Sequence, residues 1–269
     1  MSEAVLKAPT AWRPPPFIKS RTLRYGLLLG SLVYLVLAVS SLEINWERMI
    51  LGLDRGWAFV VSFLHPDFGS RWDEILMGMR ESLTMTLAAT VAGIAISIPI
   101  GLGAAKNISN PFFYYICRGI VAVSRSLQEV IVAIFFVAMF GFGPFAGFLT
   151  LSFATIGFLA KLLAEAIEDI DFIQVEAMKS TGAGWLQSIN FGVQPQVMPR
   201  LIGLCLYRLD INFRESAVVG IVGAGGIGAT LNTSIQRYEF DIAAAIILMV
   251  IGIVLALEYL SGWVRKKVQ

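Results

Sequence analysis

The chain has 269 residues, of which 57% are hydrophobic and only 15% are charged, with a net charge of +2. A soluble domain usually carries about 25% charged residues, so this composition indicates an integral membrane protein and gives no sign of a nucleic-acid partner. His65 is the only histidine, which excludes most histidine-based catalytic and metal schemes. Cys117 and Cys205 lie in apolar stretches without CxxC spacing, and we expect them to pack as small apolar side chains.

The N-terminal part of the chain is predicted to hold one span and one interfacial helix. Residues 1–24 are basic and proline-rich, and we expect an irregular tail. The apolar run at 25–42 is long enough to cross a bilayer and no cleavage motif clearly follows it, so we interpret it as a retained first transmembrane helix. Residues 43–79 carry mixed charges and tryptophans, which are typical of the membrane–water boundary. Within them, Asp54 and Arg55 interrupt an apolar run and favour an interfacial helix over a span.

Residues 80–265 are predicted to form a core of five further transmembrane helices. The second apolar run of this core is longer than one crossing, and we expect it either to tilt or to begin in the interface. A polar loop at 165–198 contains no possible span. The predicted fold is therefore an all-α integral membrane protein with six transmembrane helices. The five expected core spans are 82–105, 112–140, 144–164, 200–222 and 242–264.

Six spans place both ends of the chain on one side of the membrane. Most of the basic residues that flank the spans lie on that side: in the tail, at Lys106, in the 165–198 loop and in the closing run Arg265-Lys266-Lys267. Cytoplasmic segments are enriched in lysine and arginine. We therefore predict that both termini and this loop are cytoplasmic, with 43–79 on the periplasmic side of the inner membrane.

The 165–198 loop carries the most specific motif in the chain. Glu176-Ala177-Met178, Gly182 and Pro195 resemble the Glu-Ala-Ala…Gly…Pro loop shared by permeases of ATP-binding-cassette (ABC) importers, with methionine in place of the second alanine. We expect short helices at 176–181 and 185–191, separated by flexible glycines. Their apolar surface would be covered by a partner; a self-contained amphipathic surface helix is the alternative. The residues predicted for this surface are Phe172, Ile173, Val175, Trp185, Leu186 and Ile189.

A wider part of the chain, from about residue 65 to residue 265, is similar to the phosphonate-type transporter permeases. Gln128 departs from their pattern, because that family commonly has proline before the position of Glu129. The resemblance implies the type I fold of ABC importer permeases, preceded here by one extra N-terminal helix. The segments that carry it are 143–147, 165–168, 192–196, 207–208, 212–214 and 219–228.

The resemblance implies a pore subunit and not an enzyme. The chain has no GxxxxGK[ST] phosphate loop, so ATP and Mg would be bound by a separate ATPase dimer, and no cofactor or metal is expected in this chain. A periplasmic substrate-binding protein and a second copy of the chain would complete the importer within membrane lipid. The predicted ATPase-coupling residues are Glu176, Ala177, Gly182, Trp185 and Pro195.

Such an importer would pass a phosphorus oxyanion, such as a phosphonate or phosphite, into the cytoplasm by alternating access. The residues alone leave the identity of the anion open. They also leave two alternative functions open. One is an ion-coupled secondary anion transporter, which would take up its substrate without an ATPase. The other is a membrane enzyme acting on lipid phosphates. Such an enzyme usually needs several histidines or a carboxylate–metal cluster, and this chain has a single histidine.

Residues 223–228 form a GxGxxG pattern. A dinucleotide site would need a strand before this pattern, whereas a predicted span precedes it. We therefore expect Gly223, Gly225, Gly226 and Gly228 to form a tight connecting or re-entrant segment, where backbone amides can face an anion.

Charged residues inside the predicted spans indicate a transport pathway. An arginine at the centre of a membrane helix costs about 2.5 kcal/mol or more, and such residues normally face a bundle interior or a water-filled path. The i,i+4 spacing allows Asp210 to pair with Arg214, and Arg125 with Glu129; such pairs could merely lock helices together. Guanidinium groups also bind phosphate-like oxygens in a bidentate geometry, so we predict that Arg214 stabilises the passing anion. The full set of predicted pathway residues is Arg214, Arg208, Arg125, Glu129, Asn212 and Ser216.

Overall fold

The computed structural model of the chain describes residues 18, 20–42 and 45–268. All regular elements in these residues are helices, which confirms the predicted all-α class. The chain divides into two compact units, 1–57 and 58–269, and the boundary falls inside the second helix.

The first unit contains α1 (Arg21–Ser40) and most of α2 (Trp46–Ser62). The hydroxyl oxygen of Ser20 accepts the amide of Leu23 and caps α1, so the helix begins at Arg21 rather than at residue 25. Most of the predicted tail at 1–24 lies outside the described residues. No described side chain of α1 is buried by protein, and the helix is long and apolar enough to cross a membrane. Its surface therefore suits lipid.

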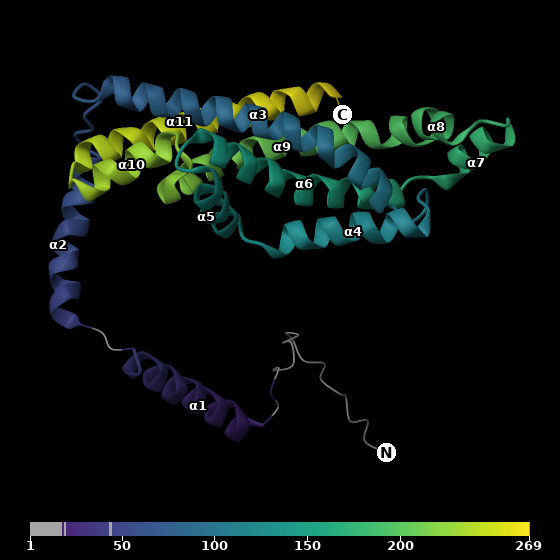
Figure 1. Cartoon of the computed structure of the whole chain (residues 1–269). Helices are drawn as coiled ribbons and strands as arrows, with labels where there is room; N and C mark the ends of the chain where they lie inside the picture. Colours follow the sequence, from purple (N-terminus) through teal and green to yellow (C-terminus); the bar gives the residue numbers. More distant parts are fainter. Residues whose placement is uncertain (1–17, 19, 43–44, 269) are drawn as a thin grey trace, which may run out of the picture. The chain divides into compact units, whose positions relative to one another are not determined.

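The second unit is a bundle of long helices joined by short turns (Figure 1). Its helices begin where the sequence supplies capping residues: Asn110 accepts the amide of Phe112 at the start of one helix, and Asp171 accepts the amide of Ile173 at another. The helices are α3 (Trp72–Ala104), α4 (Pro111–Ser126), α5 (Glu129–Phe140), α6 (Pro144–Glu168), α7 (Phe172–Ser180), α8 (Trp185–Ser188), α9 (Gln194–Val219), α10 (Ile227–Gln236) and α11 (Phe240–Val268), with π-helical turns at Ile189–Val193 and Gly220–Ala224.

Helix α6 is the centre of the bundle and contacts α3, α4, α5 and α9. Small residues let α3 and α6 approach closely: a Cβ added to Gly93 would lie 2.5 Å from the Cβ of Thr155, and one added to Gly101 would lie 2.8 Å from Leu163. Close backbone approach at small residues is the usual way in which membrane helices associate.

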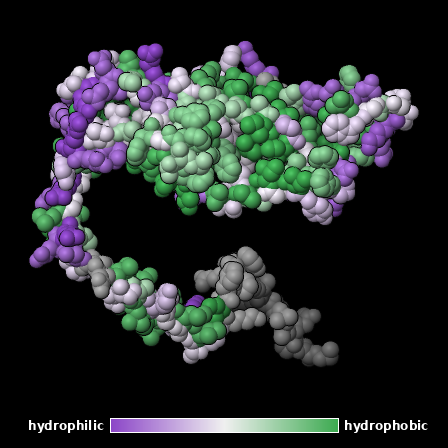
Figure 2. Space-filling model, viewed as in Figure 1, coloured by the Kyte–Doolittle hydropathy of each residue, from purple (hydrophilic) through white to green (hydrophobic). Residues whose placement is uncertain are grey.

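The surface of the bundle shows a hydrophobic band between two polar ends (Figure 2). Four helices, α1, α3, α6 and α11, are each long and apolar enough to cross a membrane, and two bent helix pairs raise the number to six if each pair is one span. This agrees with the six spans predicted from the sequence. One polar end of the bundle contains α7 and α8, which belong to the predicted cytoplasmic loop (Figure 1).

The third predicted span, 112–140, is not one continuous helix. It is broken between α4 and α5, which meet at 93°. Leu127 and Gln128 have extended backbone angles, and the φ of Gln128 is −71°. This value is close to the φ that proline imposes, so the backbone at Gln128 would also accept proline. The run therefore contains a break, which neither of the two expected explanations included.

Other boundaries also differ from the predictions. Helix α3 begins at Trp72 rather than at residue 82, and α6 continues to Glu168, inside the predicted loop. The second short helix of that loop does not stand alone, because α8 continues through a π-helical turn into α9. The sequence reading gave no helix after the glycine-rich segment, where the structure has α10. Helices α8 to α9 and α10 form the second bent pair, with an angle of 61°.

Candidate functional site

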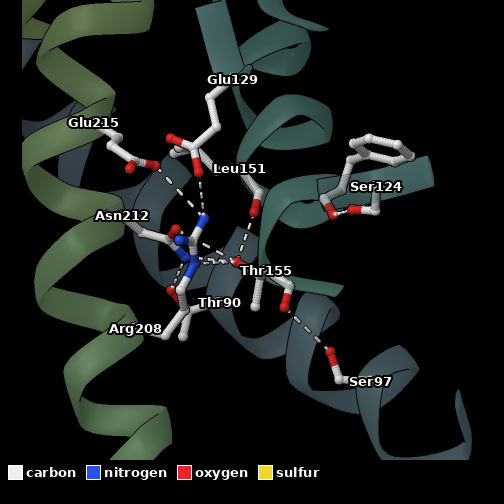
Figure 3. Close-up of polar contacts among 10 residues, drawn as sticks. Thr90, Ser97, Ser124, Glu129, Leu151, Thr155, Arg208, Asn212 and Glu215 are labelled. Carbon is white, nitrogen blue, oxygen red and sulfur yellow. Dashed lines mark hydrogen bonds and ion pairs between the residues drawn. The ribbon is translucent and has the colours of Figure 1, made fainter. Parts of the chain in front are cut away.

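Arg208 is the centre of a polar cluster in the middle of the bundle (Figure 3). Its side chain is 3% exposed. The Nη2 atom lies 3.1 Å from Oε1 of Glu129 and 3.5 Å from Oε2 of Glu215, and Nε donates to the hydroxyl oxygen of Thr155 at 3.1 Å. The guanidinium also lies over the ring of Phe158. Arg208 is thus neutralised by carboxylates of its own chain and links α9 to α5 and α6.

Asn212 forms the second part of the cluster, one turn along α9. It is fully buried, and its Nδ2 donates to the hydroxyl oxygens of Thr90 at 2.8 Å and Thr155 at 2.9 Å. Each threonine hydroxyl in turn donates to a backbone carbonyl of its own helix, on Thr86 and Leu151. The amide therefore connects α9 to α3 and α6 through satisfied hydrogen bonds (Figure 3).

The structure places Asn212 and Ser216 inside the protein and not on an open path. The Ser216 hydroxyl is buried and donates to the carbonyl of Phe213 in its own helix. Thr90 and Thr155, which sequence reasoning did not single out, contribute as much to this cluster as the predicted residues. Their signal in the sequence was a hydroxyl in an otherwise apolar span, a feature that membrane helices use for contacts between helices.

Arg214 differs from Arg208 in being half exposed. Its side chain is 53% exposed, and Nη2 lies 2.5 Å from Oδ2 of Asp210, so the predicted i,i+4 pair is confirmed. Oδ1 of Asp210 is buried and has no hydrogen-bond partner among the described residues.

The predicted pair of Arg125 and Glu129 does not form. The break between α4 and α5 removes the helical i,i+4 relationship, and Glu129 pairs with Arg208 instead. Arg125 is exposed, and within the described part of the chain it makes no ion pair. It stands in the last turn of α4, beside the break.

A recess of about 440 Å³ lies at this break. Glu129 and Glu215 are partly exposed there while also contacting Arg208, at 26% and 28% side-chain exposure. Their carboxylates therefore separate the buried guanidinium from the open recess. The residues that line the recess are Leu127, Gln128, Glu129, Val130, Glu215, Val218 and Val219.

The glycine-rich segment turns the chain sharply between α9 and α10. Gly223, Gly225 and Gly226 have φ values of 101°, 75° and 71°, which side-chain-bearing residues rarely adopt. A Cβ on Gly228 would lie 1.9 Å from the carbonyl oxygen of Ala217. A helix, and not a strand, precedes the segment, so the GxGxxG pattern lacks the context of a dinucleotide site.

Two amides of this segment already have an acceptor within the chain. The amide of Gly226 donates to Oε2 of Glu81 at 3.0 Å, and that of Ile227 donates to the hydroxyl oxygen of Ser82, also at 3.0 Å. The sequence suggested that amides here can face an anion. In this conformation the anion is the carboxylate of Glu81, at the N-terminus of α10, where negative charge is favoured.

The predicted coupling loop presents an apolar surface at one polar end of the bundle. Glu176 and Ala177 are exposed on α7, and Gly182 has a φ of 82° in the turn before α8. Pro195 is exposed in the first turn of α9. Two residues predicted for the apolar surface, Val175 and Ile189, are instead buried against the chain. The large apolar side chains exposed in this loop are Ile173, Trp185, Leu186 and Phe191.

No group of three or more histidine, cysteine, aspartate or glutamate side chains in the described residues is placed to hold a metal ion. The polar contacts of Arg208 are ion pairs and hydrogen bonds with residues of α5, α6 and α9.

Residues 97–269 match the family described as binding-protein-dependent transport system inner membrane components. The chain belongs to this family. The match covers the break between α4 and α5, the coupling loop and the glycine-rich segment. The chain is thus a permease, the membrane component of a transporter, and not an enzyme.

Several curated relatives of the permease are named for phosphorus oxyanions, and others for D-methionine. It is 39% identical over 257 residues to the phosphate-import permease protein PhnE of Mycolicibacterium smegmatis, covering 93% of the permease and 47% of the relative. It is 38% identical over 224 residues to the putative phosphite transport system permease protein HtxC of Stutzerimonas stutzeri, covering 83% and 79%. The permease thus spans about half the length of the Mycolicibacterium protein.

The fold of the permease is similar to that of solved ABC transporters. The inward-facing MetNI methionine ABC transporter has a chain that matches with a TM-score of 0.66 and 22% identity, covering 72% of the permease and 96% of that chain. At this identity the likeness shows the fold alone, and it confirms the predicted type I importer architecture.

Proposed function

We propose that the permease forms part of a passage through which a separate ABC ATPase drives a phosphorus oxyanion into the cytoplasm. The observation that carries this proposal is the contrast between two arginines on α9. Arg208 is buried and contacts two carboxylates of its own chain, whereas Arg214 is half exposed and contacts one. An arginine within a transmembrane helix strongly prefers an anionic partner. The N–H donors of its guanidinium match the oxygens of phosphate-like anions.

Within this proposal the predicted pathway residues have different roles. Arg214 binds the anion during passage, and the exposed Arg125 beside the break adds a second positive charge. Arg208, Asn212 and Ser216 support the fold in the present conformation, because their polar atoms are used by other helices or by their own backbone. Glu129 connects the fold-supporting residues with the proposed passage, since it pairs with Arg208 and lines the recess.

The identity of the anion rests on relatives whose names give phosphate, phosphite or phosphonate. These anions all present oxygens to arginine, so the passage itself can serve the class. A periplasmic binding protein is then the component that selects one member before release into the passage.

The exposed apolar side chains of α7, α8 and the π-helical turn after α8 are the proposed docking site of the ATPase. Ile173, Leu186 and Phe191 are each about two-thirds exposed or more, and water alone is a poor cover for such a patch. With the ATPase on this loop, the loop and both termini lie in the cytoplasm. ATP and Mg would be held by that partner.

A second permease subunit would complete the passage. Arg214 and the recess at the break both lie at the surface of one chain, and a charged path needs protein on its other side to exclude lipid. We propose a second copy of the same chain in this place. A related permease as the second subunit is the alternative outcome of a purification test.

Uptake in proteoliposomes tests the proposal. The permease is reconstituted with its ATPase and binding protein, and accumulation of labelled phosphite is measured with and without ATP. Competition by a phosphonate, phosphate and methionine then defines the substrate class. Uptake that needs ATP, and that phosphorus oxyanions but not methionine suppress, supports the proposal. Uptake by the permease alone along an ion gradient would establish a secondary transporter instead.

A further inference from the structure

One hydrogen bond joins residues 172–191 of the coupling loop to the turn between α3 and α4. Nε1 of Trp185, the first residue of α8, donates to the carbonyl oxygen of Ile108 at 3.2 Å, across 77 positions of sequence. Every other described hydrogen bond made by residues 172–191 stays within the loop 171–196. Trp185 is therefore the hydrogen-bond connection from residues 172–191 to the neighbouring helices, beside the apolar cluster that Val175 shares with Ala104, Ala105 and Ile167.

The α3–α4 turn is a well-defined piece of structure. The amide of Lys106 donates to Oε1 of Glu168 at 2.8 Å, and Nδ2 of Asn107 donates to the carbonyl of Ile167 at 2.7 Å. The same carboxylate of Glu168 lies 2.8 Å from Nη2 of Arg118 on α4. These contacts make the turn, the end of α6 and the first half of α4 respond together to a displacement.

The turn leads directly into α4. Asn110 caps this helix, Pro111 occupies its first position, and the helix continues without interruption to Ser126. Sixteen residues correspond to about 24 Å at 1.5 Å per residue. The far end of α4 is the break, where Glu129 begins α5 and pairs with Arg208. A displacement of the turn thus acts on one end of a rigid rod whose other end is the candidate site.

The Trp185 ring and the α3–α4 turn border the same recess. This recess has a volume of about 460 Å³, and the Trp185 side chain is 56% exposed. The hydrogen bond can therefore break and re-form without repacking a core. The recess is lined by Pro99, Leu102, Gly103, Ile108, Ser109, Asn110, Phe113, Cys117 and Trp185.

We propose that Trp185 is a positioning residue that transmits movement of the ATPase-docked loop to the α3–α4 turn, and through α4 to the break beside Glu129. This inference rests on the proposed function, because it needs an ATPase on the loop. It assigns to the indole N–H a role separate from that of the neighbouring Leu186 and Phe191, whose exposed side chains form the docking surface.

The test compares Trp185→Phe with Trp263→Phe in the complete reconstituted importer. The first variant keeps an aromatic ring and loses the N–H donor. The second makes the same change in α11, where the indole N–H has no hydrogen bond within the described residues. We expect Trp185→Phe to reduce anions taken up per ATP hydrolysed by about fivefold, the factor for losing one hydrogen bond, while the amount of copurified ATPase stays unchanged. Trp263→Phe leaves both quantities unchanged.

Hydrogen–deuterium exchange of the amides at 106–110 gives a second reading on the same complexes. In the wild type, nucleotide addition changes exchange in this turn and at 127–130; in Trp185→Phe the nucleotide-dependent change is lost at both. A wild-type ratio of uptake to hydrolysis in Trp185→Phe would overturn the inference. Loss of ATPase binding in that variant would also overturn it, by making Trp185 a docking contact. Failure of the wild-type permease to bind any ATPase would instead defeat the proposed function itself.

Discussion

Arg208 on α9 and Glu129 on α5 form a 3.1 Å ion pair across 79 positions of sequence. The pair lies where the third span is broken, and the bend brings the first carboxylate of α5 to the buried guanidinium. A second carboxylate, that of Glu215, lies 3.5 Å from the same Nη2 atom. The break therefore has an electrostatic consequence. It brings Glu129 of α5 to Arg208, which is then neutralised by carboxylates from two helices.

Removing the arginine from this cluster is predicted to destabilise the fold strongly. Arg208→Met leaves Glu129 and Glu215 without their cation, and breaking a buried pair from one side typically costs about 3–5 kcal/mol. Thermal unfolding of the purified permease in detergent measures the loss. Arg125→Met is the matched control, because Arg125 is exposed and has no ion pair in the described structure. Equal unfolding temperatures for the two variants would show that the cluster does not hold the helices together.

Asn212→Leu tests the second part of the cluster. The substitution leaves the hydroxyls of Thr90 and Thr155 without the amide that donates to them, and hydrogen bonds between membrane helices contribute about 0.6–1.7 kcal/mol each. We expect a loss of about 1–3 kcal/mol in the free energy of unfolding. Ser216→Ala removes a hydroxyl that bonds only to its own helix, and we expect a change close to zero. A larger effect for Ser216→Ala than for Asn212→Leu contradicts this assignment.

The turn after α9 is predicted to require glycine at position 228. A Cβ there meets the carbonyl oxygen of Ala217 at 1.9 Å, and a backbone atom cannot move aside as a flexible side chain can. Gly228→Ala should lower the unfolding temperature and the yield of folded permease. Gly262→Ala on α11 is the control, because nothing lies within 4 Å of its added Cβ. Normal yield and stability of Gly228→Ala would mean that α9 and α10 are further apart.

Asp67, in the segment before α3, is predicted to give a pH-dependent contribution to stability. The hydroxyl and amide of Ser70 and the amide of Gly69 donate to its carboxylate and lower its pKa from the usual 3.8. A carboxyl whose pKa is lower in the folded state stabilises the fold above its unfolded pKa, and this stabilisation is lost as the pH falls through the folded pKa. Wild type should therefore unfold at a higher temperature than Asp67→Asn at neutral pH, and the difference should disappear well below pH 3.8. A difference that is independent of pH would exclude the charged carboxylate as its cause.

Local patterns in the sequence predicted much of the architecture. The number of spans and the pair of Asp210 with Arg214 both depend on residues close together in sequence, for which periodicity and spacing are direct guides. The pairing of Arg208 was not accessible in this way. Its partners come from other helices, and the i,i+4 rule favoured Arg125 for Glu129 because it assumes an unbroken helix.

The break itself left one trace in the sequence. Gln128 departs from the proline that the resemblance predicts before Glu129, and its φ of −71° would also suit proline. Helix α10 was harder to predict from the sequence, because its sequence (IGATLNTSIQ) is short and contains few large apolar side chains. It is held instead by Glu81 and Ser82 of α3, which accept the amides of Gly226 and Ile227. Such tertiary capping is invisible to a pattern read along one segment.

The most direct test of the account is the uptake of labelled phosphite by the reconstituted importer with Arg214→Gln, compared with Arg200→Gln. Both arginines are 53% exposed and paired with one aspartate, but Arg200 lies near the start of α9, beside Asp169 at the end of α6. If Arg214 binds the passing anion, Arg214→Gln slows ATP-dependent uptake by about tenfold or more, the factor for a charge-assisted hydrogen bond, while Arg200→Gln stays within about twofold of the wild type. Undiminished uptake by a correctly inserted Arg214→Gln permease would contradict the account.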